Sequence, residues 1–143
     1  MPKSRGRRRP LPVPLVLGVA MLVFALLQVN DPDPLIWVTY YAAIAFACMV
    51  AAFGRLARVA FLVLAAVTLA GVALTFPGFV DWVFHRPTSD LWAPMSADRM
   101  YIEHSRELLG LVIAGAFLVT ADRLSRTRDE NSTVRPPEPP HSS

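Results

Sequence analysis

Residues 28–40, QVNDPDPLIWVTY, place two Asp-Pro steps between two long apolar runs. The runs 11–29 and 35–53 contain no charged residue. Each reaches about 28 Å as a helix, close to the ~30 Å hydrocarbon thickness of a bilayer. Proline disfavours helical backbone at the residue before it, so the two steps separate the runs. This stretch therefore predicts a polar hinge between two transmembrane helices.

Two further apolar runs complete the predicted fold. The run 59–80 is interrupted near its end by Pro77 and Gly78. The run 108–121 reaches only about 21 Å as a helix, but about 33 Å when extended back to residue 100. With 54% hydrophobic residues and a mean hydropathy of +0.42, the composition is typical of a membrane protein. We predict an all-α fold, an integral membrane four-helix bundle over residues 11–122, with helices at about 11–29, 35–53, 59–80 and 100–121.

The basic residues give the predicted bundle an orientation. Of the 14 lysines and arginines, all but Arg86, Arg99 and Arg106 lie before the first helix, between the second and third, or after the fourth. The positive-inside rule places these three regions in the cytoplasm. We therefore expect a multi-pass protein of the cell membrane with both termini cytoplasmic, and with the hinge and the loop 81–99 on the extracytoplasmic side.

The two ends of the chain are predicted to lie outside the bundle. Residues 1–10 form a basic cytoplasmic segment that serves as an orientation signal, and we expect no nucleic-acid partner. A cleaved secretory signal is the alternative for the first run, but the run ends without an Ala-x-Ala site, which favours an uncleaved helix. The polar, proline-rich residues 123–143 are predicted to form a disordered cytoplasmic tail.

The hinge residues admit two interpretations. In the structural one, Asn30 ends the first helix in a left-handed conformation, and Asp33 caps the second, with Pro34 at its first position. That account leaves Gln28 and Asp31 without a role. In the functional one, the hinge carboxylates lie near Trp37 and Tyr40 at the membrane interface and hold a cation or a polar headgroup.

The fourth predicted helix has charged and small residues on one face. Arg99, Glu103, Arg106 and Glu107 fall within an arc of roughly 100°, which Gly110 and Ala114 continue deeper into the membrane. A small-xxx-small pair permits close helix packing, so this face is expected to point into the bundle. Glu107 then needs a partner, for which Gln28, Asn30 and Tyr40 are candidates. A structural polar network and a ligand or ion site both fit this pattern.

Other kinds of chemistry find little support. His85 and His104 lack the spacing of metal-binding pairs, and we predict no metal site. Cys48, the single cysteine, lies in an apolar run and is expected to be a packing residue. Nucleophile motifs and glycine-rich phosphate loops are absent from the sequence, so we predict no cofactor and lean against an enzyme.

Two sequence motifs resemble one known family. The motif QVNDPDP with Trp37 and Tyr40, followed by Glu103, Arg106, Glu107 and the GLVI of residues 110–113, resembles the transmembrane protein 220 family. The resemblance implies a small multi-helix membrane protein and adds no mechanism. Residues 81–98 and both tails carry no such resemblance, and the arginine and alanine usage is typical of a bacterial chain.

Together these observations predict a polar cluster on the extracytoplasmic side. Its members are Gln28, Asn30, Asp31, Asp33, Trp37, Tyr40, Glu103, Arg106 and Glu107. We expect a noncatalytic membrane component whose cluster binds a partner, a lipid headgroup or a cation. The alternative is a membrane-embedded enzyme or proton-coupled carrier that uses Glu107. The expected partners are the lipid bilayer and either another membrane protein or a second copy of the chain.

Overall fold

The computed structural model describes residues 10–30, 33–85 and 100–133, and every regular element in this part of the chain is helical. The elements are α1 (Pro12–Leu27), a short 3₁₀ helix η1 (Gln28–Asn30), α2 (Pro34–Phe53), α3 (Arg58–His85) and α4 (Met100–Thr133). All four α-helices are long and apolar enough to cross a membrane. The predicted all-α membrane bundle of four helices is confirmed.

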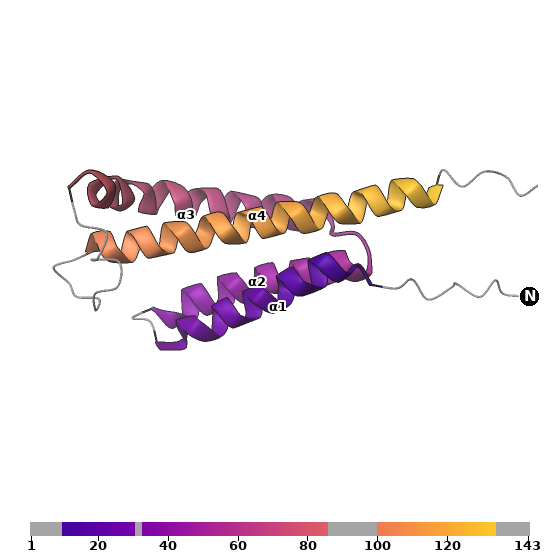
Figure 1. Ribbon diagram of the computed structural model, residues 1–143, viewed down its shortest axis with the longest axis horizontal. Helices are drawn as coiled ribbons and strands as arrows, with labels where there is room; N and C mark the ends of the chain where they lie inside the picture. The colour runs from indigo at the N-terminus through magenta and orange to yellow at the C-terminus, as the bar shows by residue number, and fades with distance from the viewer. Residues whose placement is uncertain (1–9, 31–32, 86–99, 134–143) are drawn as a thin grey trace, which may run out of the picture.

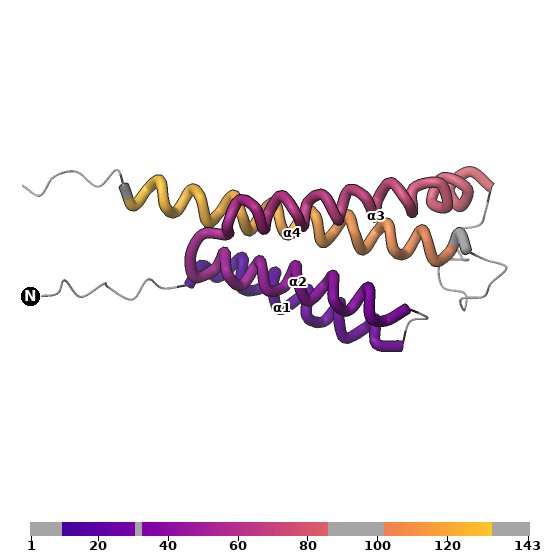
Figure 2. Tube along the Cα trace, turned by 180° about the vertical axis from the view of Figure 1, so that it is seen from behind, coloured from indigo at the N-terminus to yellow at the C-terminus, as the bar shows by residue number. Residues whose placement is uncertain are grey.

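The four helices form two hairpins that lie side by side (Figures 1 and 2). α1 packs along α2, α3 packs along α4, and contacts between α2 and α4 join the hairpins, whereas α2 and α3 touch little. The start of α1 and the end of α4 share one end of the bundle, which we call the terminal end (Figure 1). η1 and the start of α2 lie at the opposite, hinge end. The hairpins approach each other at the terminal end and diverge toward the hinge end.

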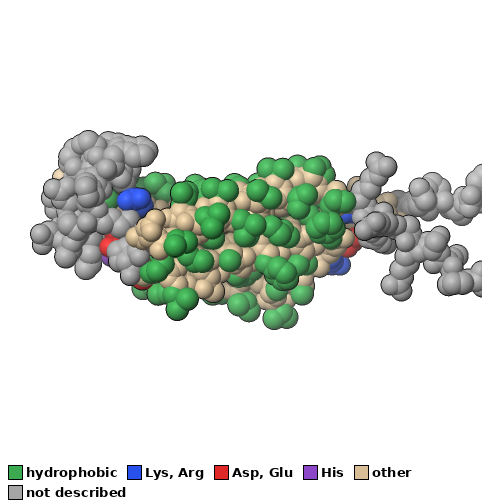
Figure 3. Space-filling view, turned by 90° about the horizontal axis from the view of Figure 1, so that it is seen from below, with side chains coloured by type: hydrophobic (Ala, Val, Ile, Leu, Met, Phe, Trp, Pro, Cys, Tyr) green, Lys and Arg blue, Asp and Glu red, His purple; other side chains and the backbone are tan. Residues whose placement is uncertain are grey.

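The core lies between α1, α2 and α4. Its fully buried side chains include Met21, Tyr41, Ile44, Leu111 and Leu118. Many large apolar side chains of α1 and α3 point outward instead, and Figure 3 shows hydrophobic side chains along the middle of the molecule, with charged ones near its ends. An apolar belt between charged ends is the surface expected of helices in lipid.

One backbone oxygen connects three segments of the chain at the terminal end. The carbonyl oxygen of Ala52, at the end of α2, accepts a hydrogen bond from the Leu11 N–H at 2.7 Å and another from Arg128 Nη1 at 3.2 Å. The start of α1, the end of α2 and the distal part of α4 therefore meet at a single atom.

α4 continues well beyond its predicted end. We expected it to stop at residue 121 and a disordered tail to start at residue 123, and this is wrong for residues 123–133. Asp122 and Ser125 are buried, and Arg126 Nε donates to Asp122 Oδ2 at 2.6 Å across one helical turn. Such i,i+4 pairs and packing sustain a helix that hydropathy does not reveal. Residues 134–143 of the predicted tail, and most of the basic segment 1–10, lie outside the described residues.

α3 also runs past its predicted end, to His85, with Pro77 inside the helix. Proline removes one backbone hydrogen bond and clashes with the preceding turn, so the helix bends rather than stops. The last turns of α3 leave the line of the rest of the helix in both views (Figures 1 and 2). Transmembrane helices tolerate proline where neighbouring helices, Ser or Thr side chains or a local change of helix geometry satisfy the freed backbone groups.

The hinge differs in detail from the structural interpretation given above. Asp33 occupies the N-cap position of α2 with Pro34 following, as expected, but its side chain makes no capping hydrogen bond. Asn30 does not adopt a left-handed conformation, since no non-glycine residue among those described has a positive φ. α1 ends instead in the 3₁₀ turn of η1. The carboxylate of Asp33 therefore remains available to its neighbours on α4.

Candidate functional site

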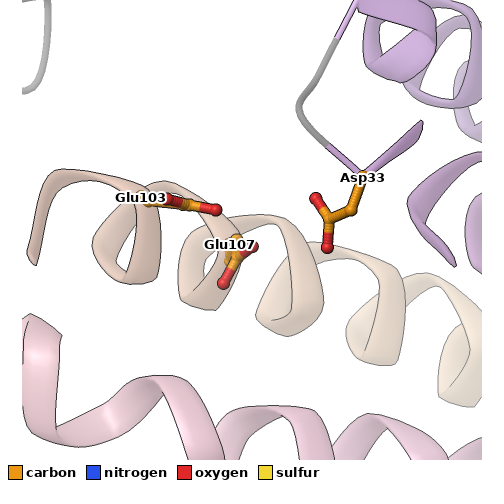
Figure 4. A group of neighbouring side chains, drawn as sticks. All are labelled: Asp33, Glu103 and Glu107. Atoms are coloured by element: carbon orange, nitrogen blue, oxygen red, sulfur yellow. The ribbon is translucent and has the colours of Figure 1, made fainter. Parts of the chain in front are cut away.

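Three carboxylates from two separate segments meet at the hinge end. The oxygen atoms offered by Asp33, Glu103 and Glu107 all lie within 4.8 Å of one another. Asp33 precedes α2 and is exposed, while Glu103 and Glu107 lie one turn apart on α4 and are half-buried (Figure 4). We call these three residues the acidic set. Close carboxylates repel one another, so the arrangement favours a bound cation.

A cleft lies between α2, α3 and α4, with the acidic set among its lining residues. Its volume is about 540 Å³, and its walls are mostly apolar side chains such as Ile36, Val67 and Leu74. These three side chains are also exposed on the outside of the bundle. Since α2 and α3 touch little, the cleft opens sideways, toward the position of the surrounding lipid. We call it the lateral cleft.

Aromatic side chains of α2 form one wall of the site. The rings of Trp37, Tyr40 and Tyr41 lie 5.2–6.3 Å apart, centroid to centroid. Phe24 of α1 adds an edge contact to Tyr41 at 5.7 Å. Aromatic pairs at such distances stabilise each other, and a ring face attracts a cation. Trp37 and Tyr40 line the lateral cleft beside the acidic set.

A hydrogen bond across α2 and α3 links the walls of the lateral cleft. Tyr40 Oη and Thr68 Oγ1 are 2.7 Å apart, and Thr68 Oγ1 also lies 2.8 Å from the Leu64 carbonyl oxygen. A threonine hydroxyl has a single hydrogen, which it donates to Leu64. Tyr40 is therefore the donor and Thr68 the acceptor.

We expect this bond to contribute measurably to stability. Tyr40→Phe and Thr68→Val should each lower the free energy of unfolding, with a coupling energy of about 0.6 kcal/mol, the usual size for hydrogen bonds between membrane helices. A double-mutant cycle in mixed micelles measures this coupling. Thr120→Ala, at an exposed threonine that bonds only its own helix, is the control. A coupling energy of zero would show that the bond does not contribute to the free energy of unfolding.

A second cavity lies between α1, α2 and α4, beside the same turns of α4. Its volume is about 400 Å³. Glu103 and Glu107 line it as well as the lateral cleft, but its other polar residues include Gln28 of η1 and Arg106 of α4. Tyr41 and Gly110 also line it. We call it the inner cavity.

The structure brings together most of the predicted polar cluster. Asp33, Trp37, Tyr40, Glu103 and Glu107 line the lateral cleft. Gln28 and Arg106 line the inner cavity with the two glutamates. Asn30 is exposed and lines neither cavity, and Asp31 lies outside the described residues. Tyr40, which we considered as a donor to Glu107, donates to Thr68 instead.

Tyr41 and His104 also belong to the site, although neither is a member of the predicted polar cluster. Tyr41 is 1% exposed and reaches α4 beside Gly110, where an added Cβ would collide with the tyrosine hydroxyl. His104 lines the lateral cleft next to Glu103 and packs against Gly78 of α3. The small residue at position 110 signalled close packing, but the sequence does not say which side chain fills the space.

The acidic set also bears on metal binding. We predicted no metal site from the spacing of histidine and cysteine, but three carboxylates form an oxygen-only group, the kind that Ca²⁺ and Mg²⁺ prefer. Both ions need more ligands than three: Ca²⁺ takes six to eight oxygens and Mg²⁺ six. Water would have to supply the rest. The three carboxylates alone thus make an incomplete metal site.

Comparison with known proteins gives one match. The model of a family described as transmembrane family 220, helix, matches residues 20–121. The match includes the second half of α1, all of α2 and α3, and α4 as far as its predicted end, and therefore both cavities. No curated protein and no solved structure matches the chain significantly.

Proposed function

The chain belongs to transmembrane family 220, and from the residues of its lateral cleft we propose that this member is a noncatalytic multi-pass membrane component that binds the positively charged head of a membrane amphiphile in that cleft. The apolar chain of the amphiphile would lie along α2 and α3, with its head among Asp33, Glu103 and Glu107. Both kinds of surface that such a ligand needs occur in one cavity.

The observation that supports this proposal most is the composition of the lateral cleft. At about 540 Å³ it is far larger than an inorganic ion, and its apolar walls suit a hydrocarbon chain. The three carboxylates suit a cation, and they lie at the hinge end of the cleft. An ammonium nitrogen bonded to three oxygens at about 2.8 Å requires these oxygens to be roughly 4.6 Å apart, which agrees with the 4.8 Å limit of the acidic set.

The sideways opening supports a ligand that arrives from the bilayer. Leu74 is 77% exposed and Ile36 is 63% exposed, although both line the cleft. In a membrane these side chains face lipid. The charge bias of the sequence assigns the hinge end to the extracytoplasmic side, so we propose that the ligand is drawn from the outer leaflet of the cell membrane.

Quenching of Trp37 fluorescence tests the proposal directly, because Trp37 lines the cleft. With Trp82 and Trp92 replaced by phenylalanine, the protein is placed in vesicles that contain a brominated lipid with either an amine head or an anionic glycerol head. We expect half-maximal quenching at about a tenfold lower mole fraction of the amine lipid, a difference of about 1.4 kcal/mol. The double substitution Asp33→Asn and Glu107→Gln should abolish this preference.

Glu130→Gln provides the matched control, because Glu130 is an exposed glutamate near the opposite end of α4. It should leave the preference unchanged. Equal quenching by both lipids in the unsubstituted protein would overturn the proposal. Displacement of the amine lipid by micromolar Ca²⁺ would instead identify the site as one for an inorganic cation.

A proton-coupled carrier or membrane enzyme that uses Glu107 is the second candidate function. One observation favours it: Glu107 lines both cavities and so contacts both sides of the hinge end. Ionisable side chains that face cavities inside a membrane bundle commonly mark proton relays. Infrared difference spectra of the protein and of Glu107→Gln across pH would show a carboxyl band that belongs to Glu107. A spectrum unchanged by the substitution would remove this candidate.

A further inference from the structure

The inner cavity differs from the lateral cleft in the charge that it can accommodate. Of its polar residues, Gln28 and Arg106 carry hydrogen-bond donors, and neither lines the lateral cleft. A guanidinium binds a phosphate through two parallel hydrogen bonds, and an amide NH₂ can add a third. The inner cavity therefore combines an anion-binding side, next to Arg106, with the two glutamates that it shares with the cleft.

The placement of Arg106 follows from the geometry of α4. Successive helical side chains point about 100° apart, so Arg106 and Glu107 face different directions from adjacent positions. Glu107 joins Asp33 and Glu103 in the acidic set, while Arg106 is exposed at the edge of the inner cavity. A cation-binding group and an anion-binding group thus lie within one helical turn of each other.

On this basis we propose that the inner cavity binds the phosphate of the same headgroup whose ammonium occupies the acidic set, so that the ligand is a zwitterionic aminophospholipid. This inference rests on the proposed function and narrows its ligand class. In an ethanolamine phosphate head, two carbons and one oxygen join the nitrogen to the phosphorus. That short link suits binding groups on adjacent turns of one helix.

The charges of the site agree with a zwitterion. Among the described residues that line the two cavities, three carry a carboxylate and one, Arg106, carries a guanidinium. A purely anionic headgroup would bring its phosphate close to those carboxylates without any compensating cation. A purely cationic head would leave the guanidinium of Arg106 without an anion from the ligand. A head with both charges presents its ammonium to the acidic set and its phosphate to Arg106.

The Trp37 quenching assay tests this inference with two brominated lipids of identical chains, one with a phosphoethanolamine head and one with an amine head that lacks phosphate. The unsubstituted protein should reach half-maximal quenching at about a fivefold to tenfold lower mole fraction of the phosphoethanolamine lipid. Arg106→Gln should abolish that difference while the amine lipid still binds. Arg106→Lys, which keeps the charge but not the planar fork, should retain part of it.

Arg123→Gln is the matched control, because Arg123 is an exposed arginine at the other end of the same helix. It should leave the difference intact. The zwitterion inference is overturned if the unsubstituted protein binds both lipids equally, or if Arg106→Gln preserves the difference. In both cases the amine lipid still quenches Trp37 and the proposed function stands. Equal quenching by the amine lipid and the anionic glycerol lipid would instead overturn the proposed function itself.

Discussion

Gly110→Ala should destabilise the bundle by about 1–3 kcal/mol, the usual cost of adding a methyl group to a filled core. The added Cβ would meet the hydroxyl of Tyr41, a side chain that is 1% exposed and so has little room to move. Alanine is otherwise the better helix former by about 1 kcal/mol, so a loss of stability must come from the collision. Unfolding in mixed micelles, followed by circular dichroism, measures the change.

Two further variants separate the collision from other causes. Tyr41→Phe removes the hydroxyl and leaves the ring carbon Cζ, which lies 3.3 Å from the position of the new Cβ. Gly110→Ala should therefore cost much less in a Tyr41→Phe background. Gly115→Ala, where the nearest atom is the Thr68 methyl group at 3.2 Å, should be close to neutral. If Tyr41→Phe gave no rescue, the close contact would not be the cause.

Gly18→Val should weaken the packing of α1 on α2 by about 2–3 kcal/mol. A Cβ at Gly18 would lie 3.0 Å from Met49 Cγ and 3.1 Å from the carbonyl oxygen of Ala45. The methionine can adjust, but the backbone oxygen cannot move unless α2 shifts as a whole. We expect the variant to unfold at lower denaturant and to show weaker protection of the α1 amides against hydrogen exchange.

Gly71→Val is the comparison for this prediction. A Cβ at Gly71 would approach the two Cδ atoms of Leu111 at 2.9 Å, which is nominally closer than the contacts at Gly18. These atoms are the tip of a flexible side chain that lines the lateral cleft, so a change of rotamer into that space can relax the contact. We expect a smaller loss than for Gly18→Val. Equal losses would mean that the backbone contact at Ala45 has no special cost.

The helices and the approach of hinge and α4 could be predicted from the sequence because each follows from a local signal. Uncharged runs of membrane length give the helices, and the Asp-Pro steps give the hinge. Topology then places the hinge and the start of α4 at the same end of an up-and-down bundle. The meeting of Asp33 with Glu103 and Glu107 agrees with that reasoning.

The remaining features depend on contacts between distant residues. The extension of α4 to Thr133 rests on the pair of Asp122 with Arg126 and on the bond from Arg128 to Ala52, whereas hydropathy reports only a polar tail. The role of Tyr41 required knowledge of which helix faces Gly110. The lateral cleft arises because α2 and α3 touch little, and no sequence signal reports an absence of packing.

The hydrogen bonds to the Ala52 oxygen join three segments at the terminal end, and the two hairpins diverge from there toward the hinge end. The bond from Arg128 connects the two hairpins at the terminal end, and both cavities lie toward the hinge end, where the hairpins diverge. Asp33 is about 28 Å along α2 from Ala52. A rotation of the α1–α2 hairpin by about 5° about Ala52 would therefore move Asp33 by roughly 2.5 Å relative to α4. That displacement is enough to disperse or assemble the three carboxylates. The hydrogen bond from Arg128 to Ala52 at the terminal end thereby bears on how closely the three carboxylates meet at the hinge end.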